Sequence, residues 1–123
     1  MRTWFIAIRF YNVGINKLGV EKLINVIASI YIKEGRLSEF LDILKSNIPK
    51  VIDEVGCIEY VPTIDVPSGL TAQTCNENVV TIIEKWHSLA DLTNHLSSPH
   101  MLAYREKVKD HVENVSLKIL REA

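Results

Sequence analysis

Residues 23–32, with the sequence LINVIASIYI, constrain the fold more than any other segment of the chain. They are rich in β-branched side chains and read as a strand, with apolar residues on both alternating faces, such as Val26 and Ile30 on one and Ile27 and Tyr31 on the other. A strand of this kind must be covered on both faces. A chain of 123 residues holds one domain with few other elements. We therefore expect helices on one face and a second subunit on the other.

The charge balance and the cysteine count exclude several classes of protein. Fourteen lysines and arginines against fifteen aspartates and glutamates leave no basic excess for nucleic-acid phosphates, so we expect no nucleic-acid partner. No apolar run reaches the ~20 residues that span a bilayer, and residues 1–9 make a poor signal peptide. Cys57 and Cys75 are too few for a disulfide framework or a zinc site. We expect a cytoplasmic protein without a membrane partner.

Hydrophobic periodicity predicts the order of the remaining elements. Residues 37–55 show helical spacing, and residues 57–61 form a short second strand. Residues 79–86 alternate as a third strand, residues 88–112 return to helical spacing, and residues 115–119 alternate as the last strand. The order is βαββαβ, so the fold class is α+β and ferredoxin-like.

Two start signals divide the second helical stretch. Ser88 followed by Asp91 resembles a capping box, with aspartate in the usual place of glutamate. Ser98 followed by Pro99 has the residue types of an N-cap and a first helical position. We therefore predict a helix that breaks at Ser98 and restarts at Pro99.

Residues 1–22 lie outside this pattern. Gly14 and Gly19 interrupt any regular element there, and the segment is too short to form its own core. We interpret it as an N-terminal arm before a domain that spans residues 23–121. Because large apolar side chains such as Trp4 would promote association in a free tail, we expect the arm to pack on the sheet edge or on a partner subunit.

Short motifs in this pattern resemble the signatures of a known family. They are residues 33–36 (KEGR), 54–60 (EVGCIEY), 84–86 (EKW) and 95–100 (HLSSPH). Their order and spacing are similar to those of the antibiotic biosynthesis monooxygenase-type domain family, which includes bacterial quinol monooxygenases. The resemblance implies a homodimer in which two ferredoxin-like sheets pack face to face as a dimeric α+β barrel. It also implies a pocket in each subunit between the sheet and the helices.

The resemblance implies several chemistries, and particular positions separate them. Members that oxidise polyketide anthrones carry asparagine where this chain has Ile82. Haem-degrading members carry asparagine, tryptophan and histidine at places that match Ala28, His95 and Arg105 here. We therefore expect a cofactor-independent monooxygenase that oxidises a small quinol or related aromatic with dioxygen. The alternatives are an isomerase of a small phosphorylated carbonyl compound, for which Lys85 and Arg105 would supply the basic groups, and a non-catalytic dimeric ligand-binding domain.

The predicted catalytic residues are His95, His100 and Glu84. An imidazole titrates near neutrality and can take a phenolic proton at working pH. The alternative is that one histidine caps the broken helix and the other is partly exposed. Glu84 shares a strand face with Trp86, and a buried carboxylate must pair, form hydrogen bonds or titrate. Trp86 is predicted to bind a planar substrate by stacking; alternatively it is a core aromatic whose indole N–H finds one partner.

The other candidate residues have weaker support. Tyr60 and Tyr104 could donate phenolic hydrogen bonds to a substrate, although such tyrosines are often core residues. Cys57 is expected to be a small buried hydrophobe, and His87 and His111 are expected on the surface.

We predict no metal and no cofactor. The five-residue spacing of His95 and His100 does not match the i, i+4 metal pair of a straight helix, and no third ligand is evident. No glycine-rich dinucleotide or phosphate-binding loop occurs in the sequence. An oxygenase remains possible without them, because a dihydroxy-aromatic anion can itself pass an electron to dioxygen.

Overall fold

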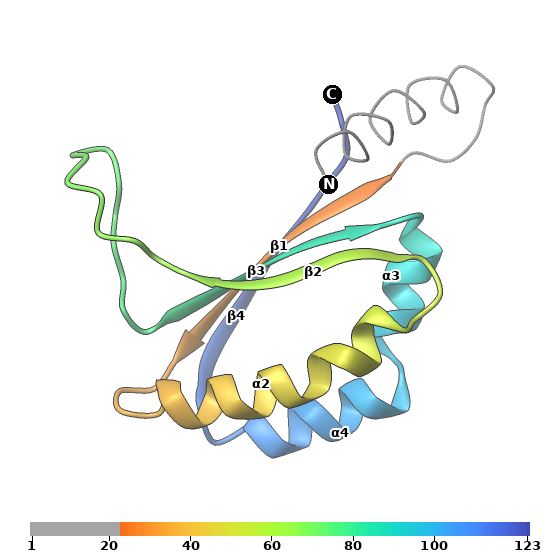
Figure 1. Ribbon diagram of the computed structural model, residues 1–123, viewed down its shortest axis with the longest axis horizontal. Coiled ribbons are helices and arrows are strands. Elements are labelled where there is room, and N and C mark those ends of the chain that lie inside the picture. Colours follow the sequence, from red (N-terminus) through yellow and green to blue (C-terminus); the bar gives the residue numbers. More distant parts are fainter. Residues whose placement is uncertain (1–22) are drawn as a thin grey trace.

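A computed structural model describes residues 23–123 of the protein (Figure 1). Four strands form one antiparallel sheet in the order β2-β3-β1-β4, and the helices lie against one of its faces. This confirms the ferredoxin-like βαββαβ fold. The predicted arm, residues 1–22, lies outside the described residues. The elements in chain order are β1 (Ile24–Ile32), α2 (Leu37–Ile52), β2 (Cys57–Ile64), β3 (Val79–Trp86), α3 (Leu89–Leu96), α4 (Pro99–Val108) and β4 (Val112–Leu120).

The two faces of the sheet differ in how far they are covered. On the helix side, alternate residues of β1 such as Val26 and Ile30 are buried. On the other side, Ile27 of β1 pairs with Ile83 of β3, which in turn pairs with Val61 of β2. Ile83 is 41% exposed and Val61 is 48% exposed. We call this second side the open face, since apolar side chains lie on it but remain accessible.

The helix α2 packs on the sheet through an apolar stripe. Phe40, Leu44 and Val51 are almost completely buried, as their helical spacing predicts. The helix continues through Pro49 and ends at Ile52. The predicted stripe ran as far as residue 55, so the helix is one turn shorter than its sequence pattern suggested.

The turn after α2 brings the chain close to α3. Gly56 has φ +84°, in the left-handed region that glycine adopts without strain. A Cβ atom at this position would overlap the side-chain carboxylate of Asp91 in α3. The backbone N–H of His87 donates to the carbonyl of Gly56 at 2.9 Å, which joins the turn to the end of β3. The segment between α2 and β2 is therefore packed tightly against the start of α3.

The two predicted helix starts are both present. The Ser88 hydroxyl accepts a hydrogen bond from the Asp91 backbone N–H at 3.1 Å, which confirms the N-terminal cap of α3. Pro99 is the first residue of α4, after Ser98 at the N-cap. The Ser98 side chain does not cap α4; its hydroxyl donates instead to the backbone carbonyl of His95 at 2.9 Å. This bond ties the beginning of α4 to the end of α3.

The strands differ from the prediction at their ends. β2 runs on through Pro62 to Ile64, where the sequence suggested a loop. Because β2 is an edge strand of the sheet, a proline is tolerated there. β4 begins at Val112, three residues before its predicted start, and residues 65–78 connect β2 to β3. Within residues 23–123, no helix has the length and apolar character needed to cross a membrane.

Candidate active site

A cavity of about 400 Å³ lies between the sheet and the helices α3 and α4. Its volume is typical of small-molecule sites. Apolar side chains make up most of the lining, for example Ile82 of β3, Met101 of α4 and Leu117 of β4. The polar and charged side chains that line it are Tyr60, Glu84, His95, Tyr104, Arg105 and Lys109. Four of the six predicted site residues therefore meet at one cavity.

His95 is the most deeply buried polar residue of the site. It lies in the last turn of α3 and is 1% exposed. Its Nδ1 lies 2.8 Å from Oε1 of Glu54, in the turn after α2. A carboxylate oxygen accepts, so Nδ1 carries the proton and Nε2 keeps its lone pair. Within residues 23–123, Nε2 has no hydrogen-bond partner in the protein.

Burial decides the charge state of His95. It lowers the pKa of the imidazole, because a charged ring would lose its hydration, while the hydrogen bond to Glu54 acts in the opposite direction. His95 is therefore neutral at neutral pH, with a free Nε2. This is the protonation state that a general base requires.

The second histidine contacts the same carboxylate from the other side. Nε2 of His100 lies 2.6 Å from Oε1 of Glu54, close but without hydrogen-bond alignment. Nδ1 of His100 lies 3.4 Å from Nδ2 of the buried Asn47 in α2. His100 is partly buried and lies outside the cavity lining. It therefore supports Glu54, while His95 faces the cavity.

Trp86 lies behind His95 and does not line the cavity. It is completely buried, and its ring centroid is 4.6 Å from that of His95. Its indole Nε1–H donates to Oε1 of Glu84 at 2.9 Å. As the last residue of β3 it pairs with Ile24 at the end of the sheet, under α3. The position corrects the expectation of a stacking wall for the substrate and matches the alternative of a core aromatic with one hydrogen bond.

Glu84 reaches the cavity from the sheet and is 6% exposed. Burial raises the pKa of its carboxyl to about 7; the nearby Glu54 adds to this rise, and the hydrogen bond from Trp86 opposes it. Among the described residues no arginine or lysine pairs with it. Near neutral pH the group is partly protonated, so it can donate as well as accept a hydrogen bond.

The two tyrosines line the cavity from different elements. Tyr60 of β2 and Tyr104 of α4 are both more than nine-tenths buried. The ring centroid of Tyr60 lies 5.6 Å from that of His95. Burial raises the pKa of both phenols, so both keep their protons. Neither hydroxyl has a hydrogen-bond partner among residues 23–123, and both can serve a ligand in the cavity.

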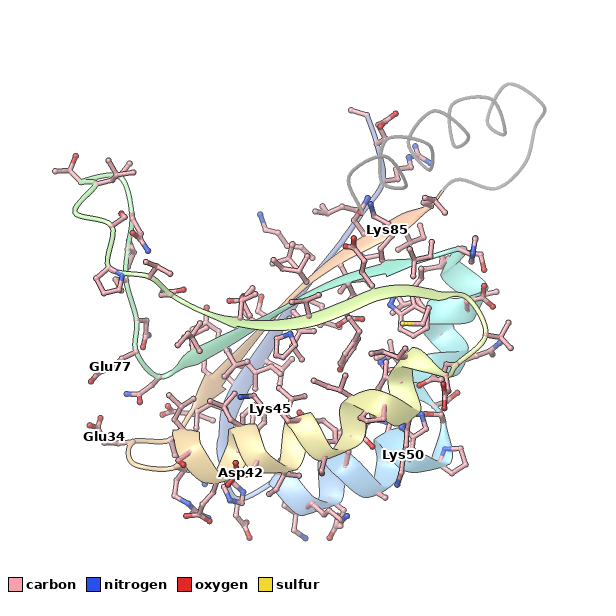
Figure 2. All side chains as sticks on the ribbon, viewed as in Figure 1. Glu34, Asp42, Lys45, Lys50, Glu77 and Lys85 are labelled. Carbon is pink, nitrogen blue, oxygen red and sulfur yellow. The ribbon has the colours of Figure 1, made fainter. Side chains whose placement is uncertain are left out.

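Two other predictions are corrected by the structure. His111 was expected on the surface but is 7% exposed, and its Nε2 lies 3.2 Å from Oε2 of Glu39 and 3.0 Å from Nη2 of Arg36. It is buried because the chain between α4 and β4 passes the start of α2. Lys85, suggested for a basic cluster at the pocket, projects from the open face (Figure 2).

Sequence reasoning missed Glu54 and Asn47 as parts of the site. Glu54 is the first residue of the motif at residues 54–60, and that position was the available signal. In the part of the chain that the structure describes, no group of three or more His, Cys, Asp or Glu side chains could hold a metal ion. Burial raises the pKa of Cys57 to about 11, so its thiol remains protonated.

Comparisons with known proteins agree with this architecture. The chain is 36% identical to the "Probable quinol monooxygenase YgiN" of Escherichia coli K12 over 101 residues, which cover 80% of this chain and 97% of that protein. Protein SO0527 from Shewanella oneidensis has a similar structure, with a TM-score of 0.69, 25% identity, and coverage of 81% of this chain and 90% of that one. A conserved protein from Methanosarcina mazei Go1 gives a TM-score of 0.71 at 24% identity, covering 82% and 93%. The sequence profile described as "Antibiotic biosynthesis monooxygenase" matches residues 23–107, and the chain belongs to that family.

Proposed function

We propose that the protein is a cofactor-independent monooxygenase that oxidises a small quinol or a related hydroxylated aromatic with dioxygen. The observation that carries this proposal is His95, a neutral imidazole fixed by Glu54 at the wall of a largely apolar cavity. The name of the relative YgiN, a quinol monooxygenase, supports the same substrate class. The membership of this chain in the antibiotic biosynthesis monooxygenase family supports the reaction type.

The reaction balances without an external electron donor. A quinol and dioxygen give a hydroxyquinone and water: one oxygen atom replaces a ring hydrogen as a hydroxyl group, and the other leaves as water. Four electrons pass from the substrate to dioxygen. Two of them come from converting the quinol to the quinone, and two from hydroxylating the ring carbon.

The residues of the cavity supply what this reaction needs from a protein. Nε2 of His95 takes a phenolic proton, and the resulting anion is the electron-rich species that reacts with dioxygen. Glu54 stabilises the imidazolium that forms, through the hydrogen bond at Nδ1. Tyr60, Tyr104 and the protonated form of Glu84 donate hydrogen bonds to oxygen atoms of the substrate as negative charge develops on them.

Oxygen consumption tests this proposal directly. Purified protein is mixed with a panel of naphthohydroquinones, and the rate is compared with that of non-enzymatic autoxidation. We expect a rate above autoxidation that falls in His95→Ala and is retained in His87→Ala, since His87 is an exposed histidine outside the cavity. Wild-type protein that never exceeds autoxidation across the panel would refute the function.

We also propose that two copies form a homodimer through their open faces. The side chains of Ile27, Val61 and Ile83 leave an accessible apolar surface on this face. A second copy packed on this surface would provide the cover that a strand with two apolar faces needs. Light scattering should give twice the monomer mass of 14.0 kDa. Ile83→Lys should shift the equilibrium towards monomer, whereas Leu102→Lys, at an exposed leucine of α4, should not. A wild-type monomer at micromolar concentration contradicts the dimer.

Residues 1–22 are proposed to be an arm that packs on the domain or on its partner, with the domain itself spanning residues 23–121. Deletion of residues 1–20 tests this. A lower melting temperature or a loss of the dimer supports the packed arm, and an unchanged melting temperature and mass contradict it.

A further inference from the structure

The cavity has a buried end and an exposed rim, where two cations lie beside the apolar side chains of Val115 and Leu117. Glu84 and His95, which line it, are 6% and 1% exposed. Arg105 and Lys109 line the same cavity but are themselves exposed. They stand four residues apart at the end of α4, a spacing that puts two side chains on one helix face. Both cations therefore lie at the mouth of the cavity.

Arg105 is held in place without a carboxylate partner. Its Nη2 donates to the backbone carbonyl of Leu96, another lining residue, at 2.6 Å. It makes no ion pair with any residue of the described chain. The charge of Arg105 adds to the lowering of the His95 pKa and opposes the rise that burial causes in the pKa of Tyr104.

The second cation at the mouth is only partly neutralised. Nζ of Lys109 lies 2.6 Å from Oε1 of Glu106, and both side chains are largely exposed. Exposed pairs of this kind are weak. Glu106 and also Asp110 raise the pKa of Lys109, so Arg105 is the cation at the mouth that has no carboxylate partner among the described residues.

A cation near the end of α4 also has a structural role, which a control must separate from ligand binding. Cations in the last turn of a helix interact favourably with its dipole, and Arg105 and Lys107 both stand in the last turn of α4. Lys107, however, does not line the cavity. It therefore offers a matched control for Arg105.

We propose that the substrate carries a carboxylate beside its hydroxylated ring and that Arg105, assisted by Lys109, binds this carboxylate at the mouth of the cavity. The inference rests on the proposed function for the hydroxylated aromatic ring. A guanidinium matches the planar geometry of a carboxylate, and exposure at the mouth lets the charge enter without full desolvation. The apolar walls at Ile82, Met101 and Leu117 suit an aromatic body.

Binding of redox-inert ligands tests the inference without any turnover. Titration calorimetry compares 2-naphthoate with 2-naphthol, which differ in the charged group. We expect wild-type protein to bind 2-naphthoate roughly tenfold more tightly, the value of one charge-assisted hydrogen bond, and added salt to reduce this preference. Arg105→Gln should remove the preference by weakening 2-naphthoate alone. Arg105→Lys should retain part of it, and Lys107→Gln should change neither ligand.

Three results would overturn the inference: equal affinity of wild-type protein for the two ligands, equal weakening of both by Arg105→Gln, or tighter binding of glycerol 3-phosphate than of 2-naphthoate. Circular dichroism of each variant checks that the fold is intact. Failure of the proposed function is separable, because it is measured by oxygen consumption. A protein that prefers 2-naphthoate but consumes no oxygen keeps the anion site and loses the oxygenase assignment.

Discussion

Within residues 23–123, a glutamate near each end of α2 contacts histidine: Glu54 contacts His95 and His100, and Glu39 contacts His111. Of these histidines, only His95 lines the cavity. His95 lies 2.8 Å from Glu54, whose side chain is 16% exposed. His111 lies 3.2 Å from Glu39, whose side chain is 64% exposed. Nε2 of His111 also contacts the guanidinium of Arg36, whereas Nε2 of His95 has no partner in residues 23–123. The contrast teaches that a short imidazole–carboxylate distance does not define a catalytic site. His95 is set apart by a partly buried carboxylate partner and by a free second nitrogen at a cavity.

The largest expected effect separates the two histidines by activity. His95→Ala removes the general base, so turnover of naphthohydroquinone should fall by roughly 10²- to 10⁴-fold. His111→Ala removes a buried ring that does not itself line the cavity, so it should lower stability and leave turnover unchanged. The measurement is oxygen consumption at a temperature well below both melting points. Equal losses in the two variants would break the comparison.

A second prediction contrasts a buried with an exposed carboxylate. The pKa of Glu84 is raised to about 7 by burial, so the folded state keeps this proton after the unfolded state has lost it. The contribution of Glu84 to the free energy of unfolding is therefore complete below about pH 4.5 and is lost as pH rises through about 7. A shift of this size corresponds to about 3 kcal/mol.

Glu84→Gln tests this, because glutamine keeps an acceptor for Trp86 but cannot ionise. Denaturant titrations give the free energy of unfolding of the wild type and of the variant at each pH. The wild-type value minus the variant value should fall between pH 5 and pH 8 by the free energy that corresponds to the pKa shift of Glu84. Subtracting the variant removes the contribution of His95, which is present in both proteins. Because the pKa of His95 is lowered, its contribution to stability increases as pH rises, opposite to that of Glu84. Glu39→Gln is the control: His111 and Arg36 lower the pKa of Glu39, so its contribution is lost only as pH falls. A constant difference for Glu84→Gln would contradict the burial argument.

A third prediction concerns how Glu54 acts. Glu54→Gln keeps the shape but removes the charge that stabilises the imidazolium of His95, so kcat should fall by about 10- to 100-fold, the value of one charge-assisted hydrogen bond. Because Glu54 raises the pKa of His95 against the effect of burial, its removal should move the rise of activity with pH to lower pH. Glu39→Gln should change neither quantity. A reduced rate with an unshifted pH profile would mean that Glu54 acts only on the fold.

Much of the fold was predictable because its signals are local. The alternation of residues 79–86 predicts the bounds of β3 to the residue, and the Ser88–Asp91 cap is formed within one helical turn. The site depends on contacts between distant segments. Glu54 and His95 are 41 residues apart in sequence, and only the packing of the turn after α2 against α3 joins them. For this reason the sequence suggested Glu84, on the strand of Trp86, as the carboxylate of the site and did not suggest Glu54.

The burial of His111 was hidden for a similar reason. Its neighbours in sequence, Asp110 and Glu113, are charged, and its burial arises from the start of α2, more than 70 residues earlier. For side chains between α4 and β4, the exposed fraction therefore depends on contacts with the start of α2. Local polarity describes the neighbours of a residue in sequence, whereas accessibility depends on which distant element covers it.

Gly56 has a consequence for the chemistry of the cavity. Glu54 stands two residues before it and His95 belongs to the helix against which it packs, with no room for even a methyl group between the turn and Asp91. The close packing of Gly56 on Asp91, together with the hydrogen bond from the His87 backbone N–H to the Gly56 carbonyl, thus limits how far Glu54 and His95 can separate. The conformational entropy of fixing the imidazole of His95 beside Glu54 is lost once, when the chain folds, and not each time a ligand binds. If His95 is the base, its imidazole already holds the orientation set by Glu54 in the absence of a ligand.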